Sequence, residues 1–163
     1  MPLASMAARW QQALALRIPP PLVLLLCGLA GWALDWRWPL ALLPQPVARL
    51  AGLALSLAGG GLALAGVLQF RRAHTTINPL NPSRSSHLVE EGLYARTRNP
   101  MSLGMALALA GWGCVLGNPL SWLGVPLFVS WITWLQIKPE EQALRQRFGP
   151  YFEQYCQRVR RWL

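Results

Sequence analysis

Charged residues are scarce in this chain, and the acidic ones are the scarcest. Only 6 of its 163 residues are Asp or Glu, against 15 Lys and Arg, and charged residues make up 13% in total. The few acids include no paired carboxylates that call for hydrolytic acid–base chemistry, and the two histidines form no Ser/His/Asp arrangement. The sequence therefore gives no support for a hydrolase.

Cysteine is equally sparse. Cys27, Cys114 and Cys156 are scattered along the chain, two of them within apolar segments. They show neither the spacing of a metal site nor an evident disulfide framework. We therefore expect three free thiols and no bound metal.

Hydrophobic residues, by contrast, account for 53% of the sequence and are gathered into blocks. Each block approaches the roughly 17 to 25 residues that cross the hydrocarbon core of a bilayer as a helix. Backbone groups must pair internally there, which favours helices. The sequence predicts an all-α integral membrane protein, with residues 1–163 as a single membrane domain and about four transmembrane helices at 18–34, 50–70, 100–116 and 121–137.

The segments between and beyond these blocks have distinct expected roles. Residues 1–17 are weakly amphipathic and are expected to lie on the membrane surface. A cleavable signal is the alternative for the first block, but three further blocks favour a retained helix. The 71–99 segment is expected to be a long cytoplasmic loop, and 139–163 two amphipathic cytoplasmic helices separated at Gly149.

The last two apolar blocks are joined by a very short link, Leu116-Gly-Asn-Pro-Leu120. Gly, Asn and Pro are typical of turns. So short a link predicts an antiparallel helical hairpin of the third and fourth spans. The glycine-rich second block, with small residues four apart, is expected to be the packing centre of the bundle.

Positive charge is distributed unequally over the predicted topology. All of the 15 Lys and Arg except Arg37 and Arg49 lie in the N-terminal segment, the 71–99 loop or the tail. The positive-inside rule then predicts cytoplasmic termini. An excess of basic residues is also found in nucleic-acid-binding proteins. Here, however, the basic residues flank the predicted spans, where contact with anionic lipid headgroups explains them. We expect the bilayer, and no nucleic acid, as a partner.

Three polar elements are predicted to meet on the cytoplasmic face. They are the Thr97-Arg-Asn-Pro100 segment, the Glu140-Glu141 pair and the aromatic tail. Arginine pairs with carboxylates, glutamate accepts hydrogen bonds from ribose hydroxyls, and aromatic rings stack on adenine. S-adenosylmethionine fits this inventory, and several nucleotides fit it as well.

Two longer stretches, SHLVEEGLYARTRNPMSLG and KPEEQALRQRFGPYFEQYCQRVRRWL, carry a resemblance. Together they resemble the isoprenylcysteine carboxyl methyltransferase family and its bacterial relatives, which are in turn similar to phospholipid methyltransferases. The match covers about residues 74 to 163, with its motifs in the family's order. It implies an integral-membrane S-adenosylmethionine-dependent methyltransferase with a lipid-like or membrane-accessible acceptor, and the resemblance suggests a bacterial inner membrane.

The resemblance also implies roles for particular residues. It assigns the main wall of the cofactor site to residues 98–102 and the polar end of the cofactor to Glu140. Arg96, Glu141 and the tail aromatics are instead expected to be structural. The full set of expected cofactor-binding residues is Ser86, His87, Leu88, Val89, Tyr94, Arg98, Asn99, Pro100, Met101, Ser102 and Glu140.

Three positions depart from the family pattern. Asn99 replaces a histidine, Ser102 replaces a tyrosine, and Gln136 stands where the eukaryotic enzymes carry a substrate-contacting arginine. Gln136 is the expected substrate-binding residue, and no residue is assigned as acid or base. The acceptor stays open between a prenylcysteine-like lipid, a phospholipid amine and a small thiol. A non-catalytic membrane module or a small transporter is the other alternative, although transporters more often carry ionisable residues within their spans.

Overall fold

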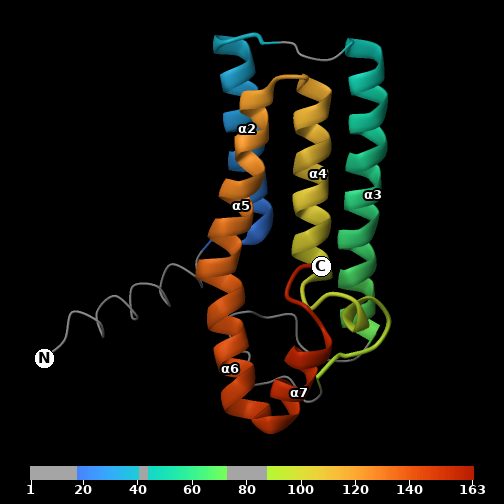
Figure 1. Cartoon of the computed structure of the whole chain (residues 1–163), viewed down its shortest axis with the longest axis vertical. Helices are drawn as coiled ribbons and strands as arrows, with labels where there is room; N and C mark the ends of the chain where they lie inside the picture. The colour runs from blue at the N-terminus through green and yellow to red at the C-terminus, as the bar shows by residue number, and fades with distance from the viewer. Residues whose placement is uncertain (1–17, 41–43, 73–87) are drawn as a thin grey trace, which may run out of the picture.

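The computed structural model describes residues 18–40, 44–72 and 88–163, and this part of the chain is helical and contains no strand. The long helices stand side by side, and successive ones run in opposite directions (Figure 1). In chain order the elements are α2 (Pro20–Arg37), α3 (Gln45–Arg72), the 3-10 helix η2 (Gly92–Ala95), α4 (Pro100–Leu116), the 3-10 helix η3 (Pro119–Leu123), α5 (Gly124–Ile132), the π-helix η4 (Thr133–Ile137), α6 (Lys138–Phe148) and α7 (Pro150–Arg158).

Two helical segments are long and apolar enough to cross a membrane. They are Gln45–Arg72 and the continuous run Pro119–Phe148, while Pro100–Leu116 is apolar but shorter. Within the described residues these are the segments that meet the criteria of length and hydropathy. The all-helical fold class is confirmed, whereas a total of four spans stays a prediction.

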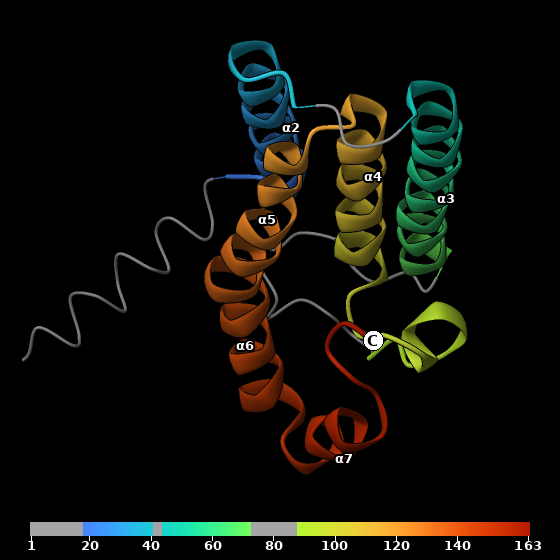
Figure 2. The same ribbon diagram turned by 45° about the horizontal axis from the view of Figure 1, so that its top comes forward.

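Helices α3 and α4 form the most extensive helix pair and lie side by side in both views (Figures 1 and 2). Their contact is lined by glycine. A Cβ added at Gly59 would lie 2.5 Å from both Ala108 N and Gly104 O, and one added at Gly52 would lie 2.5 Å from Gly111 O. Small residues allow helix backbones to approach this closely. The second apolar block therefore packs against the third through its glycines.

The predicted hairpin is present, since α4 and α5 run antiparallel across a turn at Gly117 and Asn118. Gly117 adopts a φ of 71°, which a residue without a Cβ adopts readily. The Asn118 carboxamide is fully buried; its Oδ1 accepts from Leu120 N at 2.9 Å and its Nδ2 donates to Asp35 Oδ1 at 3.1 Å. The turn is thereby tied to the end of α2.

The helix that begins at Pro119 does not stop at residue 137, where the sequence predicted the end of the fourth span. It continues through the π-helix η4 into α6 and ends at Phe148. Pro139 occupies the first turn of α6 directly after the π-helix η4, so the helix changes type at this point while the chain stays helical. The chain therefore stays helical past Pro139, and α6 extends the α5 axis beyond the end of α4 (Figure 1).

Beyond this helix the chain turns at Gly149, which has a φ of 52°, and α7 crosses beneath the bundle (Figure 2). The sequence predicted an amphipathic helix that lies on the membrane. The structure instead buries Phe152, Tyr155 and Val159 in a small cluster, with Leu88 and Leu144 among the side chains packed against it. The apolar side chains Phe152 and Tyr155 of α7 are therefore covered by protein, while Tyr151 is 54% exposed.

Candidate functional site

A pocket lies at the end of the bundle that carries α6 and α7. It is bounded by the end of α3, the 88–99 segment, α6 and α7, and it is open to solvent on one side. The pocket encloses about 70 Å³, against roughly 300–1,000 Å³ for small-molecule sites. The enclosed volume is therefore smaller than that of a typical small-molecule site. The lining residues are Phe70, Leu88, Val89, Tyr94, Arg98, Asn99, Ile137, Glu140, Glu141, Leu144, Phe152 and Tyr155.

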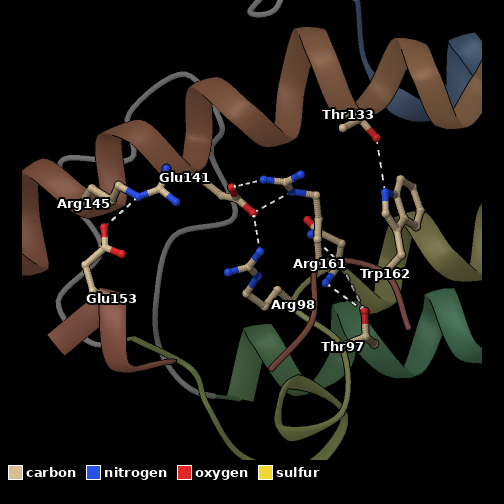
Figure 3. Close-up of polar contacts among 9 residues, drawn as sticks. Thr97, Arg98, Thr133, Glu141, Arg145, Glu153, Arg161 and Trp162 are labelled. Carbon is tan, nitrogen blue, oxygen red and sulfur yellow. Dashed lines mark hydrogen bonds and ion pairs between the residues drawn. The ribbon is translucent and has the colours of Figure 1, made fainter. Parts of the chain in front are cut away.

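The centre of the polar wall is Glu141, which is 4% exposed. Its Oε1 accepts from Arg161 Nε at 2.9 Å and lies 3.1 Å from an Arg98 terminal nitrogen, while its Oε2 accepts from the Arg161 terminal nitrogen at 2.7 Å (Figure 3). The bond to Glu141 raises the pKa of Arg161 further. One buried carboxylate therefore holds two arginines from distant parts of the chain, and the cluster carries a net positive charge.

The short tail after α7 is hydrogen-bonded to the segment that enters α4. Arg98 N donates to Arg160 O at 3.0 Å, and Asn99 Nδ2 donates to Arg161 O at 3.0 Å. Trp162 Nε1 donates to Thr133 Oγ1 in the π-helix at 3.2 Å (Figure 3). The tail is thus hydrogen-bonded both to the segment before α4, more than 60 residues away in sequence, and to the π-helix η4.

Arg98 is the one arginine that lines the pocket among the described residues. Its side chain is 11% exposed, and its Nε is buried without a hydrogen-bond partner. A buried polar group that lacks a partner is costly, and in native proteins it usually has a functional reason. Arg98 thus lines the pocket with a side chain that carries one N–H group without a partner in the described structure.

Aromatic residues form the opposite side of the pocket. Tyr155 Oη donates to Tyr94 O at 2.7 Å, and the rings of Phe70 and Tyr94 lie 6.0 Å apart. Burial raises the pKa of both tyrosines well above the usual value, so both stay neutral at physiological pH. They offer ring faces and apolar edges, not charge.

The structure brings together six of the residues that the sequence assigned to the cofactor site. These are Leu88, Val89, Tyr94, Arg98, Asn99 and Glu140. Pro100, Met101 and Ser102 form the first turn of α4 next to the pocket without lining it. Ser86 and His87 lie outside the described residues.

Gln136, the expected substrate-binding residue, does not line this pocket. Its Nε2 donates to Ile18 O at the start of α2. Substrate binding by Gln136 stays a prediction, and in this structure its amide joins α2 to the π-helix.

Sequence reasoning missed the importance of Glu141 and Arg161. Glu141 was expected to be no more than an acid in the first turn of a helix, and Arg161 an interfacial charge. The signal available was the tail sequence Arg160-Arg-Trp162, where one arginine directly precedes an anchoring aromatic residue. Which carboxylate it meets depends on the chain reversal at Gly149, and that is a property of the fold.

A pocket lined by both polar and apolar side chains lies at one end of an apolar helical bundle. The comparisons with known proteins identify the class. Residues 47–151 match the phospholipid methyltransferase family, and this match covers well over half of the chain. The protein belongs to this family.

Individual relatives agree with this assignment. An uncharacterized protein of Haemophilus influenzae is 46% identical over 63 residues, which are 39% of this chain and 100% of that protein. Protein-S-isoprenylcysteine O-methyltransferase B of Arabidopsis thaliana is 29% identical over 108 residues, 66% of this chain and 55% of the plant protein. A probable enzyme of the same name from Oryza sativa subsp. indica matches to the same degree, over 56% of its length. The chain thus spans little more than half the length of these plant relatives, and no solved structure matches it.

Proposed function

We propose that this protein transfers a methyl group from S-adenosylmethionine to a lipid-like or membrane-accessible acceptor. The observation that carries the proposal is the buried, unpartnered Nε of Arg98 in a pocket that also presents Glu140. Both residues lie at the same end of the bundle, as a shared small-molecule site requires. We further propose that the bundle crosses the membrane four times, with this end in the cytoplasm of a bacterial cell.

The residues present suit the cofactor. Arg98 offers a donor for a carboxylate, and Glu140 is exposed at the pocket wall, where it is able to accept hydrogen bonds from hydroxyl groups. Phe70, Tyr94 and Tyr155 supply aromatic faces for a flat heterocycle. The net positive charge of the Arg98–Glu141–Arg161 cluster favours an anionic group at this wall.

The residues of the chain would act mainly by position. Bound S-adenosylmethionine supplies an activated methyl group, so the protein has to orient it toward the acceptor and exclude water. Orientation alone contributes up to about 7–11 kcal/mol of barrier lowering. Arg98 would fix the carboxylate end, and the aromatic wall would fix the ring end. No described residue has to act as an acid or base when the acceptor is already a nucleophilic anion.

The acceptor is proposed to enter from the apolar side of the bundle. The names of the plant relatives favour a prenylcysteine-like carboxylate, whereas the family match favours a phospholipid amine. An amine acceptor needs to lose a proton before it attacks. Gln136 donates to a backbone carbonyl and offers no positive charge to a carboxylate. We therefore keep the phospholipid amine as the second candidate, with a small thiol as a further one.

Calorimetry of the detergent-solubilised protein with S-adenosylmethionine tests the proposal. Arg98→Ala should abolish measurable binding and leave the protein folded. Arg96→Ala is the matched control, because Arg96 is exposed two residues away and does not line the pocket. Unchanged affinity in Arg98→Ala would refute the site, and absence of binding to the wild type would favour a non-catalytic module. Labelled methyl incorporation into extracted lipids or into small thiols then distinguishes the acceptors.

A further inference from the structure

The last residues of the chain are attached to the candidate site at several points. The backbone carbonyls of Arg160 and Arg161 accept hydrogen bonds from Arg98 N and Asn99 Nδ2, both at 3.0 Å. Trp162 reaches Thr133 across the bundle end at 3.2 Å. The segment Arg160–Leu163, which we call the clamp, is therefore held by hydrogen bonds at Arg160, Arg161 and Trp162.

The side chain of Arg161 does not line the pocket but contacts Glu141, which does. It forms a bidentate pair with Glu141, whereas Arg98 contacts the same carboxylate through one terminal nitrogen at 3.1 Å. Bidentate pairs fix geometry more strictly than single contacts. Arg161 thus fixes the Glu141 carboxylate, and the carboxylate in turn fixes the terminal nitrogens of Arg98. Figure 3 shows the three side chains in this order.

Arg98 itself benefits from such support. An arginine side chain has many rotamers, and freezing them on ligand binding costs free energy. In this structure that freedom is already restricted: Arg98 is 11% exposed, its backbone N–H is bonded to the clamp, and one end of its guanidinium is held by Glu141. Its Nε is left unpaired. Arg161 does not line the pocket, so it has no direct access to a ligand there.

We propose that the clamp holds Arg98 in its ligand-binding orientation, and that Arg161 is a positioning residue which acts through Glu141. This inference rests on the proposed function, since the ligand group that Arg98 would meet is the carboxylate of S-adenosylmethionine. The proposal predicts that the Arg161 side chain, which does not line the pocket, changes the affinity for ligands that carry this carboxylate.

Asn99 belongs to the same arrangement. Its carboxamide donates to Arg161 O, so a residue at this position holds the clamp through one N–H donor. Both a carboxamide and an imidazole provide such a donor. This explains how Asn can stand where the family has His.

Calorimetry with two probes tests the clamp. S-adenosylmethionine carries the carboxylate, and 5′-methylthioadenosine lacks it. Arg161→Ala should weaken binding of S-adenosylmethionine by about tenfold, the scale on which groups that orient a binding residue act, and leave methylthioadenosine unchanged. Arg161→Lys keeps the charge without the bidentate fork and should recover only part of the loss. Arg147→Ala, which removes an exposed arginine of α6 outside the clamp and the pocket, should change neither affinity.

Two results would overturn the clamp. One is an unchanged affinity of Arg161→Ala for S-adenosylmethionine while Arg98→Ala loses binding; the proposed function would then stand alone. The other is an equal loss for both probes, which would mean that the tail merely maintains the pocket. If the wild type binds neither probe, the proposed function fails. Thermal unfolding of Arg98→Ala, Arg161→Ala and the double variant then tests the coupling between the two arginines. Strictly additive changes in the unfolding temperature would overturn the proposed coupling.

Discussion

The α3–α4 contact and the Arg98–Glu141–Arg161 cluster hold the same molecule together in opposite ways. At the first, side chains are absent: a Cβ at Gly59 would lie 2.5 Å from two backbone atoms of α4. At the second, three long side chains meet around one carboxylate that is 4% exposed. The first depends on shape and dispersion over a long surface, and the second on charge at one point.

The difference has a functional consequence. Close helix packing has no free donors or acceptors to offer, so it can position a site but cannot bind a ligand. A buried ion cluster is costly to assemble and leaves one polar atom of Arg98 unpaired. The molecule thus gathers its buried charges at the pocket, while the α3–α4 contact consists mainly of small residues and includes one hydrogen bond, from Ser56 Oγ to Ala108 O at 3.2 Å.

The largest expected effect distinguishes two adjacent acids. Glu141→Ala should lower the free energy of unfolding by about 3–5 kcal/mol, because it leaves Arg98 and Arg161 without their shared partner. Glu140→Ala should change it by less than about 0.5 kcal/mol, since Glu140 is exposed and has no hydrogen bond or ion pair in the described part of the structure. Thermal unfolding in detergent measures both. Equal losses in the two variants would show that Glu141 is not the organising residue.

The second prediction concerns the α3–α4 contact and compares two adjacent glycines, Gly59 and Gly60. Gly59→Ala should cost about 1–3 kcal/mol, because the new methyl group meets the backbone of α4 and the helices must separate. Gly60→Ala places its methyl group where no atom lies within 4 Å and should be neutral or slightly stabilising, since Ala favours helix over Gly. The same unfolding assay applies. A Gly59→Ala variant as stable as the wild type would mean that α3 and α4 do not pack closely at this position.

Much of this architecture was predictable from the sequence, because it depends on local patterns. The block at 100–116 coincides with α4, and the turn at Gly117 has the residue types that turns require. The helix expected from Pro139 to Phe148 is also present: α6 spans Lys138–Phe148 with Pro139 in its first turn, and it continues directly from the π-helix η4.

The site was predictable only in part. Arg98 and Glu140 are marked by motifs that resemble a family, and both line the pocket. The choice between Glu140 and Glu141 as the partner of an arginine depends on which face of α6 turns inward. The position of the tail depends on the reversal at Gly149. Neither is encoded in a short pattern, so the roles of Glu141 and Arg161 emerged only from the fold.

The third prediction concerns the aromatic side of the pocket. Tyr155→Phe should lower stability by about 1 kcal/mol at neutral pH through loss of the bond to Tyr94 O. Burial raises the pKa of Tyr155 above the value near 10 of the unfolded chain. The wild type should therefore keep its full stability below about pH 10 and lose it as the pH rises further, because the unfolded state ionises first. Phe does not ionise, so the difference between variant and wild type should shrink above that pH in urea titrations.

The smallest expected effect separates buried from exposed ion pairs. Arg145 Nε lies 2.8 Å from Glu153 Oε1, nearly the 2.7 Å that joins Arg161 to Glu141, and Figure 3 shows both pairs. The Arg145 and Glu153 side chains are 43% and 52% exposed, however, and water replaces such a pair at little cost. Arg145→Ala should therefore change the free energy of unfolding by at most about 1 kcal/mol, and added salt should shrink even that difference. A loss as large as that of Glu141→Ala would mean that hydrogen-bond length, and not burial, governs the ion pairs at this end of the bundle.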